Sequence, residues 1–328
     1  MNKPKVLIPH NLDQAARSYI AEHCEIVEFP KDKKLDAETL FRLVRDVDGM
    51  LQSGVRVNEE LLQHAPKLKI VANHSVGYNN FDTEAMKAHG VIGTITPHVL
   101  DDTVADLVFA LILAAARRVV ELDRKVKAGL WEAELKGEGA FGVDVHHATL
   151  GIIGMGRIGE AIAKRARFGF DMDVVYTARS RKPEAERKYE AAYMPLEELL
   201  RVSDFVVMMT PLTPETRRMI RAEHFAMMKR TAVFVNASRG QTIDEAALVE
   251  ALRSGTIYAA GLDVFEREPV DPQNPLLALP NVITLPHIGS ATRKTRAAIA
   301  MKAARNLVAG VTGQTPPDVV PELRELVD

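Results

Sequence analysis

The sequence predicts an α/β protein made of two doubly wound parallel-sheet domains, and two patterns support this fold class. Short apolar runs alternate with segments of helical periodicity along almost the whole chain, which is typical of βαβ units. One of these runs stops at Gly154-Met155-Gly156-Arg157-Ile158-Gly159, a G-x-G-x-x-G turn that leaves a strand and opens a helix. A length of 328 residues is enough for two domains of ordinary size.

The first part of the chain is expected to form a mainly parallel sheet. Strands are predicted at residues 5–10, 26–29, 49–53, 69–73 and 91–96, and helices at 13–23, 37–45, 58–64 and 83–89. Asn58 is expected to cap the third of these helices. The turn-rich loop from His74 to Asp82 follows the fourth strand, at the sheet edge where ligands bind in such folds. An ordinary connecting loop, with Asp82 capping the next helix, is the alternative interpretation.

A long helix is expected next, and it marks a candidate domain boundary because it directly precedes the Gly-rich strand. It begins near Asp101, where Thr103 and Asp106 resemble a capping box, and its apolar face predicts a helix as far as Gly129. The irregular segment that follows, residues 130–147, carries the only tryptophan, Trp131, and is expected to form a surface arm.

The second part of the chain is expected to form a six-stranded doubly wound sheet. Its strands are predicted at residues 150–154, 173–177, 204–210, 232–238, 259–265 and 281–286. A last helix is expected from about residue 290 to residue 310.

Composition excludes several classes of function. The net charge of −2 provides no basic surface for nucleic acid or for a membrane. A single cysteine, Cys24, excludes an internal disulfide framework and a cysteine-based zinc site. His146 and His147 are adjacent, which is poor spacing for metal ligands. The N-terminus lacks the apolar stretch of a signal peptide, and the most apolar segment, residues 104–116, is too short to span a bilayer. The sequence therefore predicts a cytoplasmic protein without a metal site.

The Gly-rich turn predicts a dinucleotide site. Gly154 permits the tight turn, Gly156 lets a pyrophosphate approach the backbone, and Gly159 lets the helix pack closely on the strand. The N-terminus of the helix supplies free N–H groups and positive potential for phosphate. A Gly-rich turn in any other α/β protein is the alternative, and the strand before the turn and the amphipathic segment after it favour the dinucleotide.

The end of the next strand favours NADP(H) over NAD(H). NAD sites place Asp or Glu there to bind the ribose 2′-hydroxyl, whereas this strand ends in Thr177-Ala178 and continues with Arg179, Ser180 and Arg181. A 2′-phosphate would find a guanidinium for a charge-assisted contact and a hydroxyl beside it. A solvated charge run is the alternative interpretation, and NAD(H) is the alternative cofactor.

Three side chains near strand ends of the second half form a candidate catalytic set: Arg239, Glu268 and His287. Each has an ordinary interpretation as a loop or surface residue. Together they fit one reaction, because a hydride delivered to a ketone carbon requires a proton for the oxygen. Histidine titrates near neutrality, a neighbouring carboxylate favours the imidazolium, and an arginine binds a substrate carboxylate and polarises the carbonyl. The sequence contains no G-x-S-x-G elbow, H-E-x-x-H motif or P-loop.

Five motifs resemble the D-isomer-specific 2-hydroxyacid dehydrogenase family over essentially the whole chain. They are SVGYNNFD (75–82), GIIGMGRIG (151–159), NASRGQTIDEAAL (236–248), GLDVFEREP (261–269) and LPHIGSAT (285–292). Three further segments are similar to the branch of this family that reduces glyoxylate, hydroxypyruvate and 2-ketogluconate: ARRVVELDRKVKAGLW, DVHHATLGIIGMGRIG and YTARS.

The resemblance implies a role for each matching residue. His287 would be the acid and base, Glu268 its partner, and Arg239 the group that binds the carboxylate and carbonyl of a 2-oxo acid. Substrate would also contact the backbone of Val76 and Gly77, and Ser290. The cofactor would be held by the turn (Gly154, Gly156, Arg157, Ile158, Gly159), by Arg179, Ser180 and Arg181 near the 2′-phosphate, and by Thr210, Ala237 and Asp263 beside the nicotinamide.

The resemblance also implies the domain arrangement. Residues 1–99 and 289–328 would form a flavodoxin-like substrate domain, and residues 100–288 an inserted Rossmann cofactor domain. Two copies would pair through the cofactor domains as a homodimer, with the arm around Trp131 crossing to the partner.

The predicted function is an NADPH-preferring reductase of small 2-oxo acids, with glyoxylate, hydroxypyruvate and 2-keto-D-gluconate as leading substrates and D-2-hydroxy acids as products. Oxidation of phosphite or formate on the same scaffold is one alternative. A nucleotide-sensing interaction protein is the other, and the presence of Arg239, Glu268 and His287 argues against it.

Overall fold

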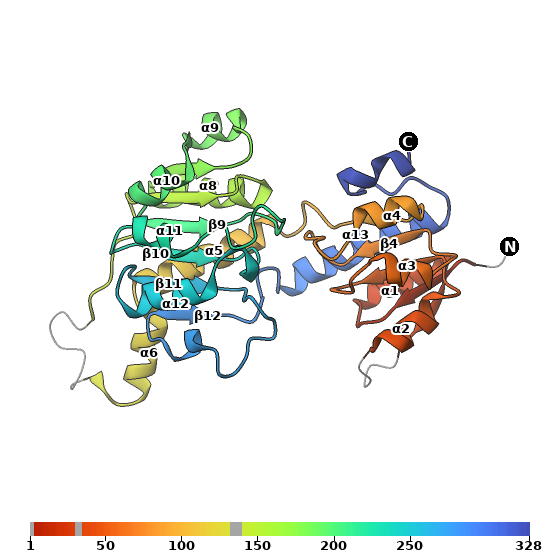
Figure 1. Cartoon of the computed structure of the whole chain (residues 1–328), viewed down its shortest axis with the longest axis horizontal. Helices are drawn as coiled ribbons and strands as arrows, with labels where there is room; N and C mark the ends of the chain where they lie inside the picture. Colours follow the sequence, from red (N-terminus) through yellow and green to blue (C-terminus); the bar gives the residue numbers. More distant parts are fainter. Residues whose placement is uncertain (1–2, 30–34, 132–139) are drawn as a thin grey trace. The chain divides into compact units, whose positions relative to one another are not determined.

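The computed structural model describes residues 3–29, 35–131 and 140–328. The chain divides into two compact units, which we call unit 1 (Met1–Leu100 with Ala291–Asp328) and unit 2 (Asp101–Ser290). The first boundary, after Leu100, lies one residue later than the sequence predicts, and the second, after Ser290, lies two residues later. Figure 1 shows the C-terminal helix within unit 1, among the N-terminal elements.

Unit 1 contains a five-stranded parallel sheet in the order β2-β1-β3-β4-β5. Its strands are β1 (Lys5–Ile8), β2 (Glu25–Glu28), β3 (Gly49–Gln52), β4 (Ile70–Asn73) and β5 (Ile92–Thr94). This is the flavodoxin order, so the flavodoxin-like fold expected for this part of the chain is confirmed.

The helices of unit 1 are α1 (Gln14–His23), α2 (Ala37–Val44), α3 (Glu59–Gln63), α4 (Thr83–Ala88) and α13 (Arg293–Val311), with a 3₁₀ segment η4 (Pro321–Leu326) near the C-terminus. The starts of the five α-helices are fixed by side chains that accept a backbone N–H of the first turn: Asp13, Asp36, Asn58, Asp82 and Thr292. The predicted caps at Asn58 and Asp82 are therefore confirmed.

Strands β1, β3 and β4 of unit 1 have side chains buried on both faces of the sheet, since successive side chains point to opposite sides. In β1, Val6 and Ile8 pack with α1 and α13, whereas Leu7 packs into the second core, which includes residues of α2, α3 and α4. This explains why the strands read as continuous apolar runs rather than as an alternating pattern.

Unit 2 contains a seven-stranded parallel sheet in the order β12-β11-β10-β9-β6-β7-β8. Its strands are β6 (Thr149–Ile153), β7 (Asp173–Thr177), β8 (Ala192–Tyr193), β9 (Phe205–Met208), β10 (Val233–Asn236), β11 (Ala259–Leu262) and β12 (Val282–Thr284). The order is that of a Rossmann sheet with one strand added beyond β11. The prediction of six strands is wrong, because β8 has two residues, both exposed, and so gives no apolar run.

The helices of unit 2 are α5 (Asp101–Ala116), α6 (Val119–Lys127), α8 (Arg157–Phe170), α9 (Pro183–Tyr189), α10 (Leu196–Val202), α11 (Ala222–Met227) and α12 (Glu245–Arg253). Two short 3₁₀ segments, η2 (Gly240–Thr242) and η3 (Pro275–Ala278), lie in its loops.

The single helix predicted from Asp101 to Gly129 is wrong, because the chain breaks between α5 and α6. Arg118 adopts a left-handed conformation with φ 55°, and its guanidinium donates to Glu121 at 2.7 and 2.9 Å. The predicted capping box is also wrong. The helix already begins at Asp101, which places Thr103 inside its first turn, and the Asp106 carboxylate instead accepts from Arg165 at 2.8 Å.

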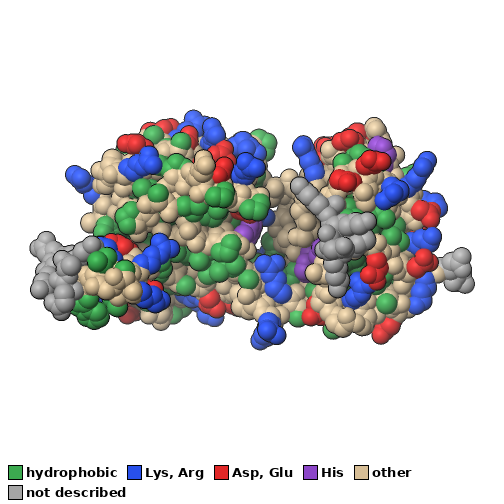
Figure 2. All heavy atoms as spheres, turned by 90° about the horizontal axis from the view of Figure 1, so that it is seen from below, with side chains coloured by type: hydrophobic (Ala, Val, Ile, Leu, Met, Phe, Trp, Pro, Cys, Tyr) green, Lys and Arg blue, Asp and Glu red, His purple; other side chains and the backbone are tan. Residues whose placement is uncertain are grey.

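The surface carries mixed charge. On the face that Figure 2 shows, Lys and Arg side chains are interspersed with Asp and Glu. Within the described ranges, no helix is both long and apolar enough to cross a membrane. Trp131, at the start of the predicted arm, is 63% exposed, and residues 132–139 of that arm lie outside the described residues.

Candidate active site

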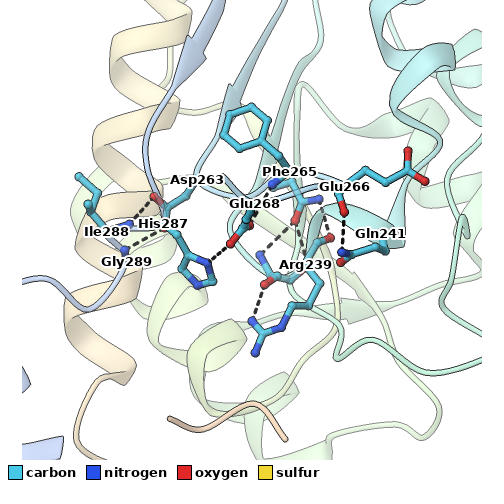
Figure 3. Close-up of polar contacts among 11 residues, drawn as sticks. Arg239, Gln241, Asp263, Phe265, Glu266, Glu268, His287, Ile288 and Gly289 are labelled. Atoms are coloured by element: carbon cyan, nitrogen blue, oxygen red, sulfur yellow. Dashed lines mark hydrogen bonds and ion pairs between the residues drawn. The ribbon is translucent and has the colours of Figure 1, made fainter. Parts of the chain in front are cut away.

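Arg239, Glu268 and His287 come together at one edge of the unit 2 sheet. They follow β10, β11 and β12, which are neighbours in that sheet and run parallel, so their carboxyl ends meet at the same edge. Figure 3 shows the His287 and Glu268 side chains pointing toward each other and the Arg239 guanidinium below them, from three separate loops. His287 Nδ1 lies 2.7 Å from Glu268 Oε2.

The Glu268 carboxylate is held from two sides. Its Oε1 accepts the Phe265 N–H at 3.1 Å, and its Oε2 contacts His287. Burial opposes ionisation of Glu268, but the hydrogen bond and charge of His287, the Phe265 N–H and the charge of Arg239 outweigh it, so the pKa of Glu268 lies below its usual value. An ionised carboxylate only accepts hydrogen bonds, so His287 donates from Nδ1 and its Nε2 is the nitrogen left for a substrate.

The backbone around His287 is held by Asp263, a buried residue at the end of β11. The two carboxylate oxygens of Asp263 accept the N–H groups of Ile288 at 2.7 Å and Gly289 at 2.8 Å, and its carbonyl accepts the His287 N–H at 3.0 Å (Figure 3). Burial raises the pKa of Asp263, while these two N–H groups act in the opposite direction. His287 itself has φ 53°, an unfavourable backbone conformation that this loop maintains.

Arg239 lies on a loop that packs closely against the loop carrying Glu268. A Cβ on Gly240 would overlap the backbone of Phe265, and Gln241 donates to the Glu266 carbonyl at 2.6 Å. The Arg239 side chain donates to the Ser238 carbonyl at 2.7 Å, and burial lowers the pKa of the Arg239 guanidinium, opposed by the charge of Glu268.

Some residues that support the Arg239 loop were not among those predicted from the sequence. The side chains of Asn236 and Thr242 donate to the Arg239 carbonyl at 3.1 and 2.6 Å. Both lie inside the motif NASRGQT, where a buried amide as the last residue of a strand is the signal that could have identified Asn236.

The Gly-rich turn between β6 and α8 fits a bound pyrophosphate. A Cβ on Gly154, which has φ 109°, would lie 2.8 Å from the Met209 backbone, and a Cβ on Gly159 would overlap the Gly154 carbonyl. Above Gly156, by contrast, a Cβ would meet nothing within 4 Å. Gly156 precedes α8, and no side chain of the described residues caps its first N–H groups. The open position and the free donors are what a phosphate requires.

The two arginines in the loop after β7 have different surroundings. Arg181 donates to Glu186 through Nη2 at 2.7 Å and Nε at 3.1 Å, and the same carboxylate accepts the Tyr176 hydroxyl at 2.7 Å. Arg179 and Ser180 are exposed, and Arg179 forms no ion pair within the described part of the chain. Glu186, which engages Arg181, was not anticipated because it lies on the next helix.

The loop with Val76 and Gly77, in unit 1, is organised by buried amides. Asn73 Nδ2 and Ser75 Oγ donate to the Gly77 carbonyl at 3.1 and 2.7 Å, and Gln52 donates to Asn73 Oδ1. Gln52 and Asn73 are at most 1% exposed. These polar residues at the ends of two apolar strands were a signal that the sequence interpretation did not use.

The remaining expected site residues follow strands of unit 2. Thr210 and Ala237 lie just beyond β9 and β10 and are half-buried, and Ser290 is the last residue of the unit. In the part of the chain that the structure describes, no three His, Cys, Asp or Glu side chains are grouped as metal ligands.

Known proteins match most of the length of the chain. The family described as "D-isomer specific 2-hydroxyacid dehydrogenase, NAD binding domain" matches residues 109–289. A glyoxylate/hydroxypyruvate reductase B from Serratia proteamaculans is 47% identical over 311 residues, covering 95% of each chain.

Solved structures agree with this result. The TT0316 protein from Thermus thermophilus superimposes with a TM-score of 0.89 at 42% identity, covering 96% of this chain and 99% of that one. An NADPH-dependent glyoxylate/hydroxypyruvate reductase from Sinorhizobium meliloti, solved with NADP and malonate, gives a TM-score of 0.85 at 33% identity, covering 98% of both chains.

Proposed function

The chain belongs to the D-isomer specific 2-hydroxyacid dehydrogenases, which are NAD(P)-dependent enzymes, and within this family we propose that it is an NADPH-preferring reductase of small 2-oxo acids. The observation that carries the proposal is the His287–Glu268 pair with Arg239 beside it, on three neighbouring strand ends. Relatives of this chain named glyoxylate/hydroxypyruvate reductase support the substrate class.

The residues divide the chemistry between them. A bound NADPH would supply the hydride for C2 of the 2-oxo acid. His287 donates the proton that the carbonyl oxygen requires, and Glu268 orients the ring and stabilises its positive charge. Arg239 binds the substrate carboxylate and polarises the carbonyl, with the backbone N–H groups of Val76 and Gly77 as further carboxylate donors. The product is a D-2-hydroxy acid.

Arg179 and Ser180 are proposed to select NADPH through its 2′-phosphate. Both are exposed at the end of β7, where NAD-binding folds usually carry an acidic residue. The relative from Sinorhizobium meliloti, which is NADPH-dependent, supports this proposal.

Two neighbouring arginines make a matched test of cofactor selection. Arg179→Ala should raise the KM for NADPH by about ten-fold or more and leave the KM for NADH nearly unchanged, because only NADPH has the 2′-phosphate. Arg181→Ala should have the smaller effect, since Glu186 already engages that guanidinium. Equal losses with both cofactors in Arg179→Ala would contradict the assignment.

The reaction is tested by a substrate panel. Purified protein is assayed for NADPH and NADH oxidation with glyoxylate, hydroxypyruvate, pyruvate and 2-keto-D-gluconate, and for cofactor reduction with phosphite and formate. The proposal predicts oxidation of NADPH by 2-oxo acids of this panel. Turnover with phosphite or formate alone would refute it. The homodimer and the cytoplasmic location expected from the sequence stay predictions.

A further inference from the structure

Two histidines of unit 1, outside the catalytic set, stack on each other at the carboxyl edge of its sheet. His10 follows β1 and His74 directly follows β4, and their ring centroids lie 5.3 Å apart with an interplanar angle of 28°. Both strands run parallel in one sheet, so this edge is the one where α/β folds bind ligands.

The pair has unsatisfied hydrogen-bonding groups. Both ring nitrogens of His10 and Nε2 of His74 are buried and have no hydrogen-bond partner among the described residues. Buried polar atoms without partners are rare, because desolvation then costs free energy that no contact returns. Each of the two residues, taken as a whole, is nevertheless only partly buried. Rotation about the last side-chain torsion, which is soft in histidine, exchanges carbon and nitrogen positions around the ring and so offers nitrogens to a molecule at the open edge.

The rings are neutral at physiological pH. Burial lowers the pKa of His10, and it lowers the pKa of His74 to about 4, with the charges of His10 and Arg296 acting in the same direction. A neutral imidazole has one donor and one acceptor. The matching partner is a hydroxyl group, which also donates and accepts, whereas a phosphate or a second carboxylate only accepts. A metal ion would need further ligands, and no group of three is present among the described residues.

The location connects the pair to the substrate. His74 immediately precedes Ser75-Val76-Gly77, the loop proposed to bind the substrate carboxylate, and lies in the same unit. We propose that His10 and His74 form a subsite for the hydroxyl groups that a 2-oxo acid carries beyond C2. The subsite rests on the proposed function, and it makes hydroxylated 2-oxo acids better substrates than unsubstituted ones.

The test compares substrates that differ in these hydroxyls. Glyoxylate ends at C2, hydroxypyruvate carries a hydroxyl on C3, and 2-keto-D-gluconate carries several. His10→Phe and His74→Phe keep a flat ring and remove its hydrogen bonds. In each variant the ratio of kcat/KM for the hydroxylated acids to kcat/KM for glyoxylate should fall by about ten-fold or more, because sites that bind a hydroxyl discriminate strongly when its partners are lost.

Two control variants separate hydrogen bonding from shape and from general damage. His10→Gln and His74→Asn keep a donor and an acceptor and should retain most of the ratio. His23→Phe alters an exposed histidine that ends α1 just before β2 begins, at the opposite edge of the sheet, and should leave the ratio unchanged. If a Phe variant does not fold, as judged by circular dichroism, His→Leu at the same position replaces it.

The outcomes distinguish this inference from the proposed function. A wild-type protein that reduces no 2-oxo acid contradicts the proposed function. A wild-type protein that reduces glyoxylate but neither hydroxylated acid contradicts only the subsite. An unchanged ratio in both Phe variants, or equal losses in the Phe and amide variants, also overturns the subsite and leaves the proposed function intact.

Discussion

The histidines of the two units have opposite surroundings. In unit 2, His287 is paired with the Glu268 carboxylate at 2.7 Å and has Arg239 nearby. In unit 1, His10 and His74 are stacked on each other, and their buried ring nitrogens have no partner among the described residues. The carboxylate beside the first histidine suits the proton transfer proposed for it, whereas burial favours the neutral form of the other two, which suits hydrogen bonding. The same side chain is therefore proposed to serve proton transfer in one unit and recognition in the other.

The largest effect is expected from removing the paired histidine. His287→Ala should lower kcat/KM for hydroxypyruvate by about 10³-fold, because general acid catalysis contributes about 10²–10⁴-fold and water replaces it poorly. NADPH affinity, measured by fluorescence titration, should change little. A loss of less than about ten-fold would show that another group supplies the proton.

The carboxylate that distinguishes His287 from the unit 1 pair is tested next. Glu268→Gln keeps a side chain of the same shape but removes the negative charge that favours the imidazolium. Activity at neutral pH should fall about 10–100-fold, because a neutral amide cannot stabilise the positive charge on the ring that donates the proton. Activity within about two-fold of the wild type would mean that Glu268 acts only by packing.

In unit 1, the amide network under the Val76–Gly77 loop, which is proposed to bind substrate, should affect binding rather than proton transfer. Asn73→Leu removes the donor to the Gly77 carbonyl, so the KM for 2-oxo acids should rise about ten-fold, with a loss of about 1–3 kcal/mol in unfolding free energy. The KM for NADPH should stay near the wild-type value. Gln63→Leu, at an exposed amide of α3, is the control and should change neither constant.

The smallest effect concerns the neutrality of His74. Its pKa in the folded chain is about 4, against 6.5 ordinarily, so between these values the unfolded chain binds a proton that the folded chain does not. Stability should therefore fall as the pH drops from about 6.5 to about 4. In His74→Phe the melting temperature should depend less on pH in this window than in the wild type or in His23→Phe. Identical slopes in all three proteins would contradict the buried neutral state.

Local patterns in the sequence were enough to group the candidate catalytic residues at one sheet edge. Apolar runs placed the strands, Asn58 and Asp82 marked helix starts, and the residues after three strands included the set that the structure brings together. Parallel strands align their carboxyl ends, so position along the chain was sufficient to group side chains far apart in sequence.

Features that depend on contacts between distant segments were not predicted. Strand β8 forms through pairing with β7 rather than through its own two exposed residues, and the break at Arg118 depends on a left-handed backbone. Two further contacts join segments more than twenty residues apart. They are the hydrogen bond from the Ile288 N–H to Asp263 and the stacking of His10 on His74. Single-segment periodicity carries no signal for such pairings.

The most direct test of the reductase assignment is the fate of the hydride. NADPH labelled with deuterium at C4 on the transferred face is incubated with hydroxypyruvate and the protein, and the glycerate formed is analysed for label and configuration. The account predicts D-glycerate that carries deuterium at C2, formed faster than with equally labelled NADH. L-Glycerate, or a product without deuterium at C2, would contradict it.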